Sequence, residues 1–223
     1  MKTPMLKRIL FYTLGLLVMT FGIALTSKAN LGVAPVSTIS YAVSLLSPLS
    51  FGMCSSCFHA LCFLTQIAIT RRLSVLAVLQ IPLVYIFGFL IDWFSAVLRF
   101  SSPHFLIGVP LMSVSALIFS LGIRIIIGSG LVLPPPDSLV RLIAEIAGWT
   151  TSKSKLLFDT SLVTFSAVFT FFFLGNAFAA VGIGTVICVL LTGPAIGFYQ
   201  KALPFFDLED LKNLKDPADP AGS

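Results

Sequence analysis

Six apolar stretches, each close to the length of a membrane-spanning helix, constrain the fold of this chain more than any other feature. They cover approximately residues 9–27, 51–70, 74–97, 104–127, 155–174 and 178–200. A helix needs roughly 20 apolar residues to cross the hydrocarbon core of a bilayer. Charged residues make up only 10% of the sequence, whereas a soluble domain contains roughly 25%. The sequence therefore predicts an all-α integral membrane protein with six transmembrane helices, the first being a retained span rather than a signal peptide.

The distribution of basic residues predicts the orientation of these helices. Two further segments, 31–47 and 131–147, are apolar but interrupted by Gly, Pro and polar residues. If neither crosses the bilayer, twelve of the fourteen Lys and Arg residues share one side with both termini, and Lys28 and Arg99 lie opposite. If both crossed, this asymmetry would weaken. Because basic residues concentrate in cytoplasmic loops, we expect six spans and cytoplasmic termini. The basic composition thus reflects topology, and nucleic acid is not an expected partner.

The chain repeats itself weakly when it is shifted by 100 residues. Each half contains a span, a Gly-containing polar break, a Pro, a short amphipathic segment and two more spans. Gly88 and Gly193 also begin similar segments, "GFLIDWF" and "GPAIGFY", once a small gap is allowed. Since each copy contributes three spans, the copies must cross the bilayer in opposite directions, as in the inverted repeats of secondary transporters. The expected units are a first repeat at 1–100, a second at 101–203 and a cytoplasmic amphipathic or disordered tail at 204–223. The residues that recur are Leu17, Gly22, Ile23, Leu31, Pro35 and Phe58, which fall on Leu117, Gly122, Ile123, Leu131, Pro135 and Phe158.

The polar breaks predict helices that enter the membrane without crossing it. Gly and Pro in "LTSKANLGVAPVS" and "GSGLVLPPPDS" suit an irregular backbone followed by a helix start. Such backbone survives at membrane depth only where protein buries it or where it lines a watery cavity. Ser37 or Thr38 in the first copy and Asp137 or Ser138 in the second are the expected N-caps. Segment 137–147 also has the charge pattern of a helix lying on the membrane surface. We favour two broken or re-entrant half-helices, because the break and its prolines occur twice.

The stretch "FGIALTSKANLGVAPVSTISYAVS" contains Gly22, Ala29, Leu31, Gly32 and Pro35. It resembles the signature of the bacterial YczE/YyaS/YitT family of small multispanning membrane proteins, and "GTVICVLLTGPAIGFY" near the end of the chain is also similar. Two positions depart from the family pattern, where an aromatic residue and an Asp usually follow the Pro. Here these are Val36 and Ser37, so that the acid occurs only in the second copy, as Asp137. The resemblance implies a multi-pass protein of the bacterial inner membrane with unassigned function.

Polar and ionisable residues inside the apolar segments are the candidates for a binding site. His59 and Asp159 coincide at the 100-residue shift, and an ionisable group in a span costs roughly 2.5–3.5 kcal/mol. The structural alternatives are a packing hydrogen bond for His59 and a helix-internal pair with Lys155 for Asp159. Asp137, partly neutralised by Arg141 one turn along, is the expected acceptor of a proton or cation. The predicted solute-binding residues are Asn30, Pro35, Ser37, Thr38, Tyr41, His59, Pro135, Asp137, Ser138, Arg141 and Asp159.

These features favour a secondary transporter that binds a small polar or charged solute at the interface between the repeats. The alternative is a membrane factor without transport activity that supports the assembly or export of another product. A third hypothesis, a membrane thiol oxidoreductase, rests on Cys54 and Cys57 in "CSSCFH", but the sequence has no second thiol pair to relay electrons. We expect no enzyme activity, cofactor or metal, since neither His lies in a nucleophile motif. The expected partners are the lipid bilayer, a small solute and, as an option, a second copy in a homodimer.

Overall fold

The computed structural model describes residues 5–71, 75–100 and 104–203, and most of the backbone within these ranges is helical. The long helices are α1 (Met5–Lys28), α3 (Phe51–Thr70), α4 (Val75–Val97), α5 (Phe105–Ser129), α7 (Thr151–Leu174) and α8 (Ile183–Ala202). The shorter elements are the 3-10 turn η1 (Pro35–Ser37) and the helices α2 (Thr38–Leu46) and α6 (Pro135–Ala147). The predicted tail at 204–223 lies outside the described residues.

All six long helices contain a segment that is long and apolar enough to span a membrane; in α4 this segment is Gln80–Val97. Their outward faces carry large apolar side chains, such as Tyr85, Leu106 and Phe172, whose exposed fractions are 71%, 84% and 78%. Contact of such faces with lipid tails is favourable, whereas their exposure to water is unfavourable. The predicted all-α membrane fold with six spanning helices is confirmed.

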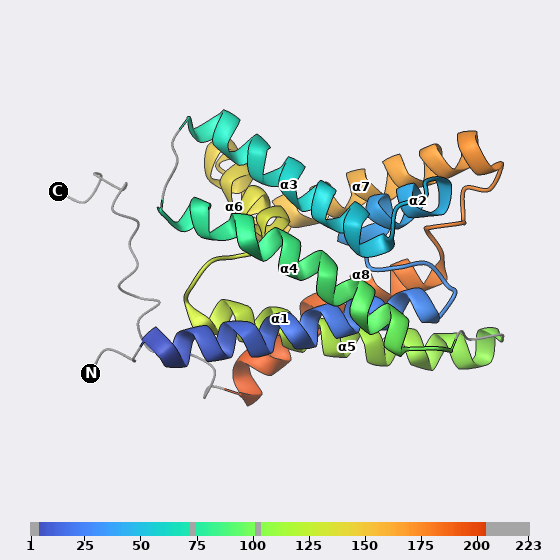
Figure 1. The fold of residues 1–223 in the computed structure, drawn as a ribbon, viewed down its shortest axis with the longest axis horizontal. Helices are drawn as coiled ribbons and strands as arrows, with labels where there is room; N and C mark the ends of the chain where they lie inside the picture. Colours follow the sequence, from blue (N-terminus) through green and yellow to red (C-terminus); the bar gives the residue numbers. More distant parts are fainter. Residues whose placement is uncertain (1–4, 72–74, 101–103, 204–223) are drawn as a thin grey trace.

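The helix boundaries follow the 100-residue shift found in the sequence. The helices α1 and α5 begin at Met5 and Phe105, and α3 and α7 begin at Phe51 and Thr151. Figure 1 shows α1 and α5 side by side and running in opposite directions, and α3 and α7 also run in opposite directions. In the same view, the start of α1 and the end of α3 lie at one end of the molecule, whereas the end of α1 and the start of α5 lie at the other. The six-span topology requires this grouping of helix ends.

The core of the molecule lies where α1 and α5 meet at close range. A β-carbon at Gly22 of α1 would lie 2.6 Å from the backbone nitrogen of Phe119 in α5. Gly122 of α5 faces the backbone of Met19 in α1 in the same way. Small residues let helix backbones approach closely in membranes. The buried apolar side chains around this contact include Tyr12, Leu16, Met19, Ile23, Phe87, Ile91, Phe119, Ile123 and Ile126.

The short helices α2 and α6 both pack against α3 and α7. Thr38, Ser40 and Ala42 of α2 are buried, as are Leu139 and Val140 of α6. A helix lying on the membrane surface would place its apolar side against lipid, whereas α2 and α6 each pack against two long helices. The packing therefore favours the re-entrant interpretation of both segments.

Of the predicted N-cap residues of these short helices, only Ser37 occupies an N-cap position. The helix α6 begins earlier than expected, at Pro135, so that Asp137 lies within its first turn and Ser138 after it. Proline suits this position because its missing N–H would have no partner within the helix. Ser37 does occupy the N-cap of α2, but its side chain makes no capping hydrogen bond. Thr38 Oγ1 donates instead to a carbonyl oxygen of the preceding turn, at 2.8 Å.

Ser50 and Thr150, which coincide at the 100-residue shift, cap α3 and α7 with their side chains. Their hydroxyl oxygens accept hydrogen bonds from Met53 N at 3.1 Å and Lys153 N at 3.3 Å, and the Ser50 hydroxyl also donates to Asp92. We expect Thr150→Ala to lower the free energy of unfolding by about 1 kcal/mol. Ser50→Ala should lower it further, because it also removes a hydrogen bond to a carboxylate. Chemical unfolding in mixed detergent micelles checks this order, and equal losses would contradict it.

Candidate functional site

Each polar break is held in place by a side chain from the other half of the chain. Val33 O, in the first break, accepts a hydrogen bond from Thr185 Oγ1 of α8 at 2.9 Å. Leu133 O, in the second, accepts one from Gln80 Nε2 of α4 at 3.2 Å. The two acceptors coincide at the 100-residue shift, and the two donors coincide when α4 and α8 are aligned through "GFLIDWF" and "GPAIGFY". Each half therefore provides a hydrogen-bond donor to a backbone carbonyl in the break of the other half, and buried irregular backbone needs such partners.

Further hydrogen bonds fix the backbone on both sides of the breaks. Leu31 O accepts from the backbone nitrogen of Gly184 at 2.9 Å, and Pro135 O accepts from Gln66 Nε2 at 2.7 Å. Ser138 Oγ donates to the carbonyl oxygen of Leu133 at 3.1 Å. These bonds hold the starts of η1 and α6 against α8 and α3. Side chains at those starts are thereby fixed relative to the long helices.

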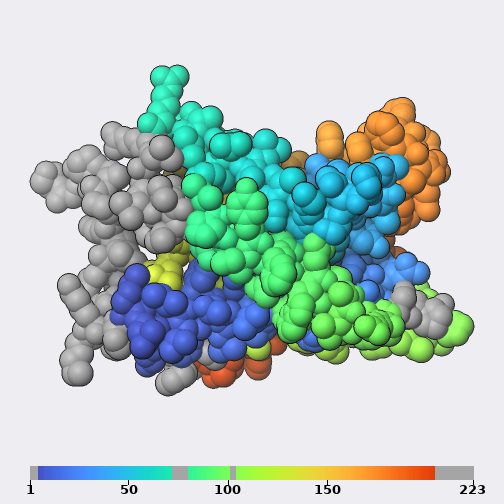
Figure 2. Space-filling model, in the orientation of Figure 1, coloured from blue at the N-terminus to red at the C-terminus, as the bar shows by residue number. Residues whose placement is uncertain are grey.

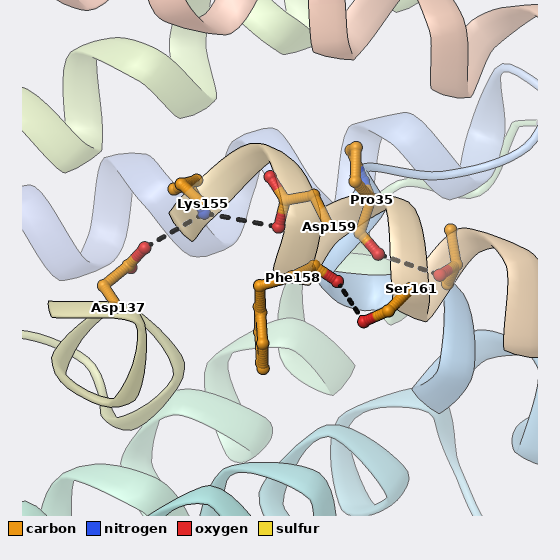
Figure 3. Close-up of polar contacts among 7 residues, drawn as sticks. Pro35, Asp137, Lys155, Phe158, Asp159 and Ser161 are labelled. Atoms are coloured by element: carbon orange, nitrogen blue, oxygen red, sulfur yellow. Dashed lines mark hydrogen bonds and ion pairs between the residues drawn. The ribbon is translucent and has the colours of Figure 1, made fainter. Parts of the chain in front are cut away.

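Asp137, Lys155 and Asp159 form a charged cluster between α6 and α7. Lys155 Nζ lies 3.1 Å from Asp137 Oδ1 and 3.5 Å from Asp159 Oδ1. Figure 3 shows the lysine between the two carboxylates, with Asp137 reaching it from the first turn of α6. The exposed fractions of the side chains are 30% for Lys155, 18% for Asp137 and 17% for Asp159. With all three groups ionised, this Asp-Lys-Asp cluster carries a net negative charge.

A cavity of about 550 Å³ lies between α7 and α8 beside this cluster. Lys155 and Asp159 line it, so one end of the cavity is charged. The other polar residues of its lining are mainly threonines on α7 and α8. Most of the wall is apolar, including Pro35 and Val36 of η1 and Phe119 of α5. The cavity therefore offers an apolar chamber with a carboxylate and an ammonium group at one side.

The structure brings some of the predicted binding residues to this site. Pro35 and Asp159 line the cavity, and Asp137 belongs to the charged cluster. Pro135 and Ser138 lie beside it at the start of α6, where they hold the second break through their hydrogen bonds. These five residues come from both halves of the chain. The prediction of a site at the meeting point of the two breaks is consistent with this grouping.

Other predicted residues lie away from the cavity lining. His59 is buried and its ring packs at a tilt against Phe87 of α4, with ring centroids 4.2 Å apart. Tyr41 packs edge-on against Phe51 with centroids 5.3 Å apart. Asn30 is exposed in a left-handed turn with a φ of 56°. The buried side chains of Ser37 and Thr38 contribute to packing around η1 and α2 instead.

Arg141 does not neutralise Asp137 as the sequence predicted. Its side chain pairs with Glu145 at 3.2 Å, and both side chains are about 60% exposed, at 62% and 60%. Lys155 takes the expected place of Arg141 instead. The sequence identified Lys155 only as a helix-internal partner of Asp159, because nothing local to α7 indicates that α6 brings a second carboxylate to it. The sequence analysis also did not predict the side chains that hold the breaks, namely Gln66, Gln80 and Thr185. The last two correspond to each other in the repeat.

The cysteine motif "CSSCFH" lies in the first half of α3. Cys54 is buried and Cys57 is exposed on α3, and both are free thiols. Cys54 Sγ lies 4.0 Å from Ser47 Oγ. Among the described residues, no three His, Cys, Asp or Glu side chains are grouped as metal ligands. The motif thus contributes packing and one polar contact to the start of α3.

Fold and site together define a multi-pass α-helical membrane protein with a charged cavity between helices. The chain belongs to a family of unknown function, DUF6198, whose model matches residues 6–201. It is also 26% identical over 200 residues to the uncharacterized membrane protein YczE of Bacillus subtilis (strain 168), covering 89% of this chain and 87% of that protein. No solved structure matches the chain. The resemblance to YczE-type membrane proteins, read from the first break, is confirmed.

Proposed function

We propose that this protein is a transporter that binds a small amphipathic cation in the cavity between α7 and α8. The observation that carries the proposal is the Asp-Lys-Asp cluster at one side of a mostly apolar cavity of about 550 Å³. Ligand sites in proteins are typically apolar chambers of this size with a few converging polar groups. An ionisable group at membrane depth is rarely kept without a use.

The charge of the cluster favours a cationic ligand. Lys155 lies between two carboxylates, so one negative charge has no partner within the cluster. Asp159 lines the cavity, whereas Asp137 reaches Lys155 from α6. An ammonium group in the cavity would pair with Asp159, while Lys155 would stay with Asp137. In the absence of solute, a proton would neutralise Asp159 instead. Exchange of this proton for the solute provides a route to coupled transport.

The arrangement of the halves supports transport rather than binding alone. Corresponding helices run in opposite directions, and a broken segment follows the first helix of each half (Figure 1). In secondary transporters with inverted repeats, solute sites lie at the repeat interface, where such broken helices meet. The cavity lies beside the first break and beside the cluster reached from the second. With cytoplasmic termini, the charged end of this cavity would lie toward the cytoplasm.

Phenethylammonium, which combines an aromatic ring with a primary ammonium group, is a suitable probe. We expect the purified protein to bind it in equilibrium dialysis and 2-phenylethanol, its neutral counterpart, at least about tenfold more weakly, since a hydrogen bond to a charged group contributes roughly 1.5–3 kcal/mol. Asp159→Asn should weaken phenethylammonium binding by a similar factor. Glu145→Gln, at an exposed ion pair, should not. Equal binding of the two probes, or unchanged binding by Asp159→Asn, would overturn the proposal.

A further inference from the structure

The two halves of the chain differ at one pair of corresponding helix contacts. The helices α3 and α4 pack directly against each other, whereas α7 and α8, both fully described, are separated by the cavity. Figure 2 shows α3 (cyan) and α4 (green) as one continuous surface on the face of the molecule that is turned toward the viewer. We call the contact between α3 and α4 the closed seam and the space between α7 and α8 the open seam.

Glycines at corresponding positions are closely packed in the closed seam and unpacked in the open seam. In the closed seam, a β-carbon at Gly88 would overlap the carbonyl oxygen of Gly52, and one at Gly52 would overlap the carbonyl oxygen of Gly88. Gly193 aligns with Gly88 in the repeat, yet a β-carbon at Gly193 would meet nothing within 4 Å. The same holds for Gly197, one turn further along α8. The open seam thus contains small residues that would permit a close contact between helices, but in this structure no such contact forms there.

Hydrogen bonds fasten the closed seam. Asp92 of α4 accepts hydrogen bonds from the hydroxyl of Ser50 and, at 2.8 Å, from the backbone nitrogen of Gly52. Ser56 Oγ donates to the carbonyl oxygen of Val84 at 2.9 Å. At the start of α3, these bonds replace contacts that the backbone would otherwise make with water. If the seam opened to water, water would replace these partners, and no polar group of the seam would be left unpaired.

The helix α3 buries two polar side chains whose counterparts in the second half line the cavity. Ser55 and His59 on α3 have exposed fractions of 3% and 4%. Ser55 Oγ has no hydrogen-bond partner among the described residues. At the 100-residue shift these two residues correspond to Lys155 and Asp159, which line the open seam. Leaving a buried polar group such as the Ser55 hydroxyl unpaired is unfavourable, and His59 packs against Phe87 of α4 across the closed seam.

We propose that the closed seam between α3 and α4 is the second gate to the solute site, and that it opens when the open seam closes around Gly193. This proposal rests on the transport function proposed above. The two halves would exchange conformations, with Gly193 taking the role that Gly88 has in this structure. Because the halves point in opposite directions, the two openings would face opposite sides of the membrane. The present structure is then the state open at α7 and α8.

Cysteine labelling tests whether the two seams are coupled. The four native cysteines are replaced by alanine, and single reporters are introduced by Ser55→Cys, at a buried position of α3, and by Thr192→Cys in the cavity. A membrane-impermeant maleimide is applied to either side of oriented membrane vesicles. We expect the two reporters to react from opposite sides, the cavity reporter faster. Reaction of both from the same side would overturn the proposal.

Two matched substitutions shift the equilibrium in opposite directions. Gly88→Leu prevents close packing of α3 and α4, so labelling at position 55 should rise at least tenfold and labelling at position 192 should fall. Gly193→Leu blocks closure of α7 on α8, so labelling at position 55 should fall while position 192 stays reactive. A local packing defect would raise labelling at position 55 without lowering it at position 192, and that result would overturn the proposal.

Two controls distinguish failure of the gate proposal from failure of a variant to fold and from failure of the proposed transport function. If Gly88→Leu does not fold, Asp92→Asn weakens the same seam without adding bulk and should produce the same reciprocal change on a smaller scale. Labelling needs no solute, so its outcome is independent of phenethylammonium binding. Intact binding without reciprocal labelling overturns the gate alone, whereas reciprocal labelling without binding overturns the proposed ligand and leaves the gate.

Discussion

Replacing Gly122 by leucine is expected to eliminate the folded protein. A β-carbon at this position would overlap the backbone of Met19, and the opposite helix approaches equally closely at Gly22. Backbone atoms cannot rotate away as a flexible side chain can, so α1 and α5 would have to separate. The buried apolar side chains around them would then lose their contacts. Overpacking a core by smaller changes already lowers stability by about 1–3 kcal/mol, and we expect a loss well above that range.

The yield of monodisperse protein in size-exclusion chromatography measures this effect. Gly197→Leu is the matched control, because a β-carbon at Gly197 meets nothing within 4 Å and a leucine there has free space. It should be recovered at the level of the unmodified protein. A Gly122→Leu protein that is monodisperse and as resistant to heat as the unmodified protein would show that α1 and α5 do not pack as described.

Hydropathy and the internal repeat predicted most of the fold, because both depend on information local to each helix. Apolar stretches of spanning length become membrane helices wherever they occur in the chain. Gly22 and Gly122 recur at the 100-residue shift because each lies at the close contact between α1 and α5. Ser50 and Thr150 recur because each caps the following helix. These pairs have equivalent roles in both halves, so an alignment finds them.

The candidate site was harder to predict because it depends on contacts between helices and on differences between the halves. The ion pair of Asp137 with Lys155 joins α6 to α7, and the sequence around either residue does not show it. His59 was placed in the site because it aligns with Asp159, but alignment assumes that both halves have the same conformation. One seam is closed and the other open, so His59 is buried against Phe87 while Asp159 lines the cavity.

Substituting Lys155 by methionine should destabilise the protein more than any other single change in the charged cluster. It would leave Asp137 and Asp159, with exposed fractions of 18% and 17%, facing each other without a cation between them. Removing one partner from a fully buried ion pair costs about 3–5 kcal/mol, and exposed pairs contribute at most about 1 kcal/mol. Since the Lys155 side chain is 30% exposed, we expect a loss of roughly 2 kcal/mol in the free energy of unfolding.

Chemical unfolding in mixed micelles measures this loss, and two comparisons show whether charge causes it. Arg141→Met breaks an exposed ion pair and should change the free energy of unfolding by less than about 1 kcal/mol. Adding Asp137→Asn and Asp159→Asn to Lys155→Met removes every charge from the cluster and should restore most of the lost stability. A triple variant as unstable as Lys155→Met would mean that the lysine acts through packing of its aliphatic chain. If the triple variant is stable but no longer binds phenethylammonium, the charges are dispensable for the fold and needed for the ligand, which is the division of roles that a solute site predicts.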